Sequence, residues 1–300
     1  MKIFLRILIG LFFIASGISK LSAMEGFELY IYSFGFASFD LCSYFARLVI
    51  AAEMAIGGCL VFKTMYRTAK SLTWLSLILF SAFLVWRMIL GDSESCHCMG
   101  DLVDMNPIQS LIKNVVLMGM LFFLRKDGGG MRRSFSGLIS SVLVVVALGC
   151  AFAINPPDAF LRAGRNSHDL VYEQFRPVAD SLELSSGRKM VCFYSATCEH
   201  CRRCASKVSS IVTRHRIPDE NLSVMFMQTS SKQDSVCVAF FEENAGGKVL
   251  PYHYLHPYYF LPLTNGSMPL VVLLEDGAVV KEYDYIALDE QEIVDFFFVK

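Results

Sequence analysis

Residues 189–201 of the 300-residue chain read KMVCFYSATCEHC. The run from Met190 to Tyr194 is apolar and suited to a β-strand. Small polar residues follow, and the pair Cys198 and Cys201 then opens a helix-like segment over 202–214. The pattern predicts a strand, a turn and a helix, with both thiols in the first turn of that helix.

Two cysteines placed in this way are suited to thiol–disulfide exchange. A thiolate at a helix N-terminus is stabilised by free backbone N–H groups and by the helix dipole. The two residues between the cysteines let the second sulfur close a bridge with the first. A protonated His200 stabilises the thiolate further and Glu199 opposes it, so the reduction potential stays open. We expect Cys198 to attack and Cys201 to resolve.

Two other interpretations of the C-x-x-C pair remain. It is half of a zinc site if Cys204 and His215 supply the other ligands, because structural zinc takes four Cys or His ligands. Alternatively, the two cysteines simply pack in a core.

The run resembles the active-site motif of thioredoxin-like proteins. Residues 266–274, GSMPLVVLL, strengthen the resemblance. It implies a cis-proline at Pro269, before a core strand and facing the C-x-x-C, where it shapes the substrate-binding edge. The pattern from Arg188 onward predicts the order β-α-β-α-β-β-α, which fits a thioredoxin-like α/β domain over 188–300.

The first half of the chain has a different composition. The whole chain is 54% hydrophobic and only 18% charged, with a mean hydropathy of +0.46, which is typical of a membrane protein. Five apolar runs, each near the ~20 residues of a bilayer span, predict about five transmembrane helices: 3–21, 41–62, 72–90, 108–124 and 135–154. The alternative for the first run is a cleaved signal peptide. The predicted fold class is therefore a multi-span α-helical membrane bundle over 1–155 and the α/β domain, joined by a linker over 156–187 that carries a short amphipathic helix around 169–184.

Charge predicts the orientation and some of the partners. Lys and Arg gather at the N-terminus and in the second-to-third and fourth-to-fifth connections, whereas the other two connections are acidic. Basic loops stay cytoplasmic, so we expect the N-terminus inside and the C-terminal domain outside a bacterial-type inner membrane. Membrane lipid is an expected partner. The net charge of −1 and the lack of a basic, aromatic-rich groove argue against nucleic acid.

A second cysteine pair lies in the third-to-fourth connection, where residues 92–101 read DSESCHCMGD. This loop is predicted on the same side of the membrane as the C-x-x-C. Cys96 and Cys98 can form a strained, readily reduced disulfide that exchanges with the first pair. They can also bind copper together with His97 or Met99, or form a structural or incidental pair.

Three stretches, 16–21 (SGISKL), 53–60 (EMAIGGCL) and 96–101 (CHCMGD), resemble DoxX-like and MauE-like membrane proteins. Met99 departs from the aromatic residue usual in that loop. The MauE resemblance implies disulfide formation during methylamine dehydrogenase maturation, and the DoxX resemblance implies quinone-linked oxidoreduction. Vitamin K epoxide reductase homologues, which join a membrane quinone reductase to a thioredoxin-like domain, are similar in logic only.

Ionisable residues inside the predicted spans are costly in hydrocarbon. Glu53 and Lys113 are predicted either to pair structurally or to contribute to a quinone headgroup or proton site. Arg47 and Arg87 lie near span ends, from which their side chains are expected to reach the interface.

Together these observations predict a membrane-anchored thiol–disulfide oxidoreductase, an enzyme that acts on extracytoplasmic client proteins. Electrons would pass between the C-x-x-C and the C-x-C loop, with a quinone as a possible cofactor. One alternative is a non-enzymatic metal-handling or assembly factor that binds copper or zinc at the C-x-C loop. Another is a membrane anchor whose C-terminal domain alone is active. The direction of electron flow and the client stay open.

Overall fold

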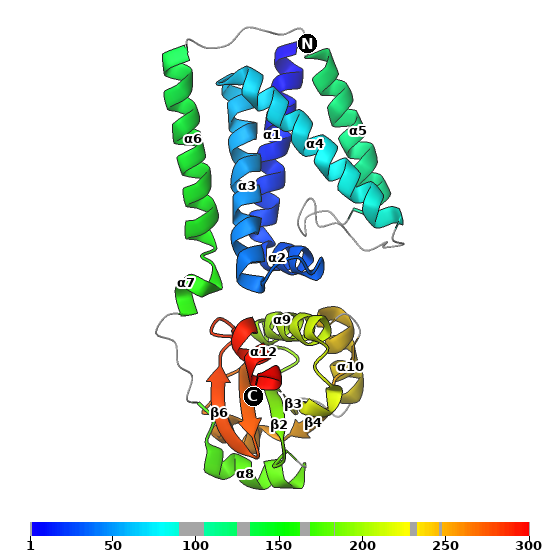
Figure 1. The fold of residues 1–300 in the computed structure, drawn as a ribbon, viewed down its shortest axis with the longest axis vertical. Helices are drawn as coiled ribbons and strands as arrows, with labels where there is room; N and C mark the ends of the chain where they lie inside the picture. The colour runs from blue at the N-terminus through cyan, green and yellow to red at the C-terminus, as the bar shows by residue number, and fades with distance from the viewer. Residues whose placement is uncertain are drawn as a thin grey trace. The chain divides into compact units, whose positions relative to one another are not determined.

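The chain forms two compact units (Figure 1). The structure is a computed structural model that describes residues 2–89, 105–124, 133–162, 169–182, 184–228, 233–245 and 248–299. Unit 1 comprises residues 1–34 and 41–157, and unit 2 comprises residues 35–40 and 158–300. Each unit is considered by itself.

Unit 1 is helical. Its elements are α1 (Lys2–Ser22), α2 (Met24–Ser33), α3 (Phe39–Phe62, whose first two residues belong to unit 2), α4 (Tyr66–Ile89), α5 (Pro107–Phe123) and α6 (Arg133–Ile154). Within the described ranges, α1, α3, α4 and most of α6 are long and apolar enough to cross a membrane, and α5 is apolar but has only 17 residues. These helices confirm the predicted bundle of a multi-pass membrane protein. The short helix α2 was not predicted.

Two glycines let α1 and α3 approach closely. A Cβ atom built on Gly57 would lie 2.6 Å from the carbonyl oxygen of Gly10, and one on Gly10 would lie 2.8 Å from that of Gly57. Gly17 similarly faces Met54, whose Cγ would lie 2.6 Å from an added Cβ. Small residues at helix interfaces allow such contacts in membranes. This packing aligns the end of α1 with the middle of α3.

Arg47 and Arg87 are buried, contrary to the prediction that they reach the interface. Arg47 is only 3% exposed; it forms an ion pair with Glu28 and donates to the Asn155 carbonyl at 2.7 Å. Arg87 is also 3% exposed and donates to the Tyr30 hydroxyl at 2.7 Å. Both corrections have one cause, because the unpredicted helix α2 supplies a polar partner to each arginine.

Unit 2 is built on a mixed sheet in the order β4-β3-β2-β5-β6 among the described residues. The strands are β2 (Arg188–Tyr194), β3 (Leu222–Met227), β4 (Tyr252–Leu255), β5 (Leu270–Glu275) and β6 (Ala278–Tyr283). β2 pairs in parallel with β3 and antiparallel with β5. β3 pairs in parallel with β4, and β5 antiparallel with β6. All side chains from Met190 to Tyr194 are buried, which explains the apolar run.

Helices cover both faces of this sheet. The helices of unit 2 are α7 (Asp158–Arg162), α8 (Tyr172–Ser181), α9 (Glu199–His215), α10 (Gln233–Asn244), α11 (Pro257–Leu263) and α12 (Glu290–Phe298), with a 3-10 turn η1 (Asp219–Asn221). Phe175 of α8 and Phe260 of α11 pack on Phe193, and Tyr194 on the other face contacts Phe240 of α10. Alternation along β2 sends these neighbours to opposite faces.

Two features of unit 2 differ from the predictions. The range 156–187 was predicted as a linker with a short amphipathic helix. That helix is present as α8, but it belongs to the α/β unit, since Phe175 is fully buried in the sheet's core. The predicted β-α-β-α-β-β-α order is present with β4 and α11 inserted before β5. The cause of the first difference is long-range packing, since the apolar face of α8 meets partners far along the chain.

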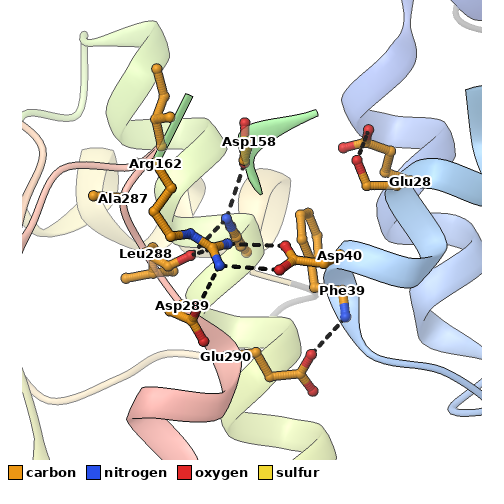
Figure 2. A network of polar contacts seen from close by, with 12 residues as sticks. Glu28, Phe39, Asp40, Asp158, Arg162, Ala287, Leu288, Asp289 and Glu290 are labelled. Atoms are coloured by element: carbon orange, nitrogen blue, oxygen red, sulfur yellow. Dashed lines mark hydrogen bonds and ion pairs between the residues drawn. The ribbon is translucent and has the colours of Figure 1, made fainter. Parts of the chain in front are cut away.

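Unit 2 also includes Gly35–Asp40, which precede and begin α3. Figure 2 shows the polar network around Arg162, whose guanidinium binds Asp40 at 3.0 and 3.1 Å and also pairs with Asp289. The Phe39 N–H donates to Glu290 at 2.6 Å. Glu290 also contacts His215 at 2.7 Å. The network joins four segments of unit 2, namely the start of α3, α7, the end of α9 and the start of α12.

Candidate active site at the start of helix α9

Cys198 is the N-cap residue of α9, with an extended backbone (φ −87°, ψ 121°). Its N–H donates to the Ser195 carbonyl at 3.1 Å, which closes the turn after β2. The Cys198 side chain is partly exposed. Cys198 therefore stands at the start of the helix, where the N–H groups of the first turn have no partner within the helix, although its side chain makes no capping hydrogen bond.

Cys201 has a contrasting environment. It is fully buried, and its sulfur accepts a hydrogen bond from the Ser195 N–H at 3.4 Å. Burial raises the pKa of the Cys201 thiol well above its ordinary value; the Ser195 N–H opposes this rise, and hydrogen bonding with Cys198 adds to it. The sulfur that meets solvent is thus Cys198, and the protected sulfur beside it is Cys201. This difference suits the predicted attacking and resolving roles.

Pro269 lies beside the same turn. The Met268–Pro269 peptide bond is cis, as the resemblance implied. β5 begins at Leu270, which pairs antiparallel with Phe193 near the end of β2. Continuing that register by one residue places Pro269 opposite Tyr194, at the end of the sheet from which the C-x-x-C turn leaves.

Two further thiols lie behind the site. Cys192 and Cys204 are buried, and both interact with the Tyr194 hydroxyl, which lies 3.6 Å from the Cys204 sulfur. Burial raises the pKa of Cys192 to about 12, although its hydrogen bond with Tyr194 lowers it somewhat. Burial likewise raises the pKa of Cys204. At neutral pH these thiols are protonated, which suits packing rather than nucleophilic attack.

The zinc interpretation of the C-x-x-C fails on distance. His215 lies at the far end of α9, fourteen residues beyond Cys201, which corresponds to about 21 Å along a helix. The imidazole of His215 contacts Glu290 instead. Among the described residues, no group of three or more His, Cys, Asp or Glu side chains could hold a metal ion.

Both residues between the two cysteines have partners that were not predicted. Glu199 forms an ion pair with Arg203 at 2.6 Å, one turn further along α9. The ring of His200 stacks on Tyr285, with centroids 5.0 Å apart and planes at 17°. The Glu199–Arg203 spacing of four residues was visible in the sequence, whereas nothing local marks Tyr285.

The other predicted site residues belong to unit 1. Cys96 and Cys98 lie outside the described residues. Glu53, half-buried in α3, pairs with Lys20 of α1 at 2.5 Å, and its second oxygen accepts from Ser16 at 3.3 Å. Lys113 of α5 lies over the rings of Phe12 and Phe80, at 5.6 and 5.7 Å.

The cationic partner of Glu53 is thus Lys20 rather than the predicted Lys113. Lys20 is only 5% exposed. Lys20 lies near the end of the first predicted span, within the quoted stretch SGISKL. The close α1–α3 packing brings it to Glu53, and that contact has no local sequence signal.

Comparison with known proteins finds similarity for the first part of the chain and for its whole length. Residues 1–125 match the family model of methylamine utilisation protein MauE. Protein TlpB of Flavobacterium psychrophilum is 24% identical to the chain, over 97% of this chain and 93% of its own length. No solved structure is significantly similar to the chain. The chain is therefore similar to the MauE family over residues 1–125 and to TlpB over nearly its whole length.

Proposed function

We propose that the chain is a membrane-bound thiol–disulfide oxidoreductase whose reactive pair is Cys198 and Cys201. The observation that carries the proposal is the contrast between a partly exposed Cys198 at the start of α9 and a buried Cys201 beside it. The sheet order and the cis-proline next to this turn support a thioredoxin-like domain.

The exchange step needs only these two sulfurs and a client. The Cys198 thiolate attacks one sulfur of a client disulfide, and the other client sulfur leaves as a thiolate. Cys201 then loses its proton and attacks the Cys198 sulfur, which closes the Cys198–Cys201 disulfide and releases the second client thiolate. The client gains two electrons and two protons. The reverse sequence oxidises a client dithiol.

We further propose that the domain exchanges electrons with Cys96 and Cys98. In the oxidising direction, the Cys198–Cys201 dithiol would reduce a Cys96–Cys98 disulfide, and a quinone would take the two electrons and two protons. The Lys20–Glu53–Ser16 cluster offers hydrogen-bonding groups for a quinone oxygen within unit 1, with Lys113 as a second candidate. The predicted orientation puts both cysteine pairs outside an inner membrane.

Thiol trapping in intact cells tests the relay. Acid quenching followed by alkylation with a mass-tagged maleimide compares the wild type with Cys96→Ser, Cys98→Ser, Cys198→Ser and Cys201→Ser. A mixed disulfide between Cys198 and the C-x-C loop, trapped in the Cys201→Ser variant, is the expected result. Unpaired thiols in all four variants would rule out the relay, and thiols that label only after a chelator is added would favour the metal-handling alternative.

A further inference from the structure

Tyr285 lies against the C-x-x-C motif from a distant part of the chain. Its ring stacks on His200, the residue directly before Cys201, with a centroid separation of 5.0 Å. His200 is exposed and Tyr285 is half-buried. The stack therefore covers one face of an imidazole that solvent would otherwise surround.

Hydrogen bonds within the turn that carries Tyr285 stabilise it. The Asp284 carboxylate accepts hydrogen bonds from the N–H groups of Ile286 at 2.9 Å and Ala287 at 2.6 Å. The Leu288 N–H closes the turn by donating to the Asp284 carbonyl at 3.2 Å. Tyr285 thus lies inside a hydrogen-bonded turn, which limits the positions that its ring can take.

Side chains from other elements also bind this turn. The Leu288 carbonyl accepts from Lys207 of α9 at 3.1 Å and from Arg162 at 3.2 Å. Asp289 pairs with Arg162 (Figure 2). Asp289 also caps α12 by accepting from the Gln291 and Glu292 N–H groups at 2.8 and 3.2 Å. Because Lys207 belongs to the helix that the cysteines begin, the turn and the motif are fixed to one another.

We propose that Tyr285 is a positioning residue that raises the reactivity of Cys198 by holding the His200 ring at the first turn of α9. This inference rests on the proposed exchange function. A protonated imidazole stacked on a phenol ring is stabilised by the ring's electrons. The stack thereby holds the imidazole at the first turn of α9, where its protonated form would stabilise the Cys198 thiolate, and it reduces the side-chain freedom that His200 must lose to stay there.

Several charged side chains lie near this stack, and the test does not alter them. Glu199 is drawn to Arg203, which partly neutralises it. The Arg202 guanidinium lies 3.4 Å from the Ala196 carbonyl, and the Asp284 carboxylate is engaged by its own turn. A substitution at Tyr285 therefore removes the ring contact without removing a charge.

The test uses the full chain in detergent, with Cys96 and Cys98 changed to Ser so that a single reactive pair remains. The protein is equilibrated with reduced and oxidised glutathione, and mass spectrometry of the peptide carrying residues 198 and 201 gives the fraction reduced. We expect Tyr285→Leu to lower the equilibrium constant for the reduced form about three-fold, and Tyr285→Phe to leave it unchanged. Iodoacetamide should alkylate Cys198 more slowly in Tyr285→Leu.

Two comparisons keep the test specific. Tyr258→Leu removes a tyrosine that is 74% exposed on α11 and should change nothing. In a His200→Ala background, Tyr285→Leu should have no further effect, because its partner ring is absent. An equal effect with and without His200 would mean that Tyr285 acts only on the fold, and would overturn the inference.

The two proposals fail in different ways. If the wild-type pair exchanges with glutathione and Tyr285→Leu matches it, the positioning role is wrong and the exchange function stands. If the wild-type pair forms no reversible disulfide, the exchange function itself is wrong.

Discussion

The Cys198–Cys201 pair of unit 2 and the Lys20–Glu53 pair of unit 1 differ in sequence separation and in exposure to solvent. The cysteines are separated by two residues, and the first of them is open to solvent. Lys20 and Glu53 are 33 residues apart, and Lys20 is almost fully buried. The local pair depends on a single helix start, whereas the distant pair depends on the packing of two helices. Mutation should therefore affect chemistry at one pair and folding at the other.

The largest expected effect tests the chemical side of this comparison. Cys198→Ser should lower glutathione exchange at the site at least a hundred-fold, since it removes the attacking sulfur, with the melting temperature unchanged. Cys204→Ala, which removes a buried thiol one turn further along α9, is the control and should keep most of the exchange. Exchange rates and thermal unfolding are measured for both variants. If Cys198→Ser retained exchange, Cys198 would not be the attacking sulfur.

The next effect concerns the ion pair in unit 1. Lys20→Met leaves Glu53 without its ammonium partner and should destabilise the protein by about 3 kcal/mol, because a buried charge loses its counter-ion. Adding Glu53→Leu should restore much of that loss. Unfolding in mixed micelles measures both variants. Equal stability of the single and double variants would show that the pair does not support the packing of α1 on α3.

A smaller effect sharpens the packing argument. Gly57→Ala places a methyl group 2.6 Å from the Gly10 carbonyl oxygen, so the helices must separate, at a cost of about 1–3 kcal/mol. Gly119→Ala on α5 is the matched control, since nothing lies within 4 Å of an added Cβ there. The same micelle unfolding assay should separate the two variants, and indistinguishable stabilities would contradict the close α1–α3 contact.

The smallest effect lies in the pH dependence of unit 2. The folded protein holds the pKa of Cys192 at about 12, above its ordinary value of 9.0, so the unfolded chain releases this proton first as pH rises. Stability is thus fully present below pH 9 and falls between pH 9 and 12. The loss attributable to this thiol should be about 1 kcal/mol at pH 10.

Cys192→Ala tests this assignment. The reduced variant should lose less stability than the reduced wild type between pH 8 and pH 10 when urea midpoints are compared. Identical losses would mean that Cys192 ionises as readily in the folded protein as in the unfolded chain.

The contrast between the two pairs also explains what could be predicted from the sequence. The strand, turn and helix around Cys198 follow from neighbouring residues, and so do the apolar helices of unit 1. The partners Lys20, Tyr285 and Glu28 do not, because each reaches its site through packing between elements far apart in the chain. The burial of Phe175 escaped prediction for the same reason, since α8 packs on strand residues such as Phe193.

The inclusion of Gly35–Asp40 in unit 2 has a practical consequence for dissecting the protein. Unit 2 is a discontinuous domain, so a soluble fragment that begins at Asp158 would lack the carboxylate that binds Arg162 and the backbone N–H that binds Glu290. Arg214 would also lose the carbonyls of Gly35 and Ala37. Joining residues 35–40 to the fragment through a short linker should restore these contacts. A fragment meant to reproduce unit 2 should therefore include these residues.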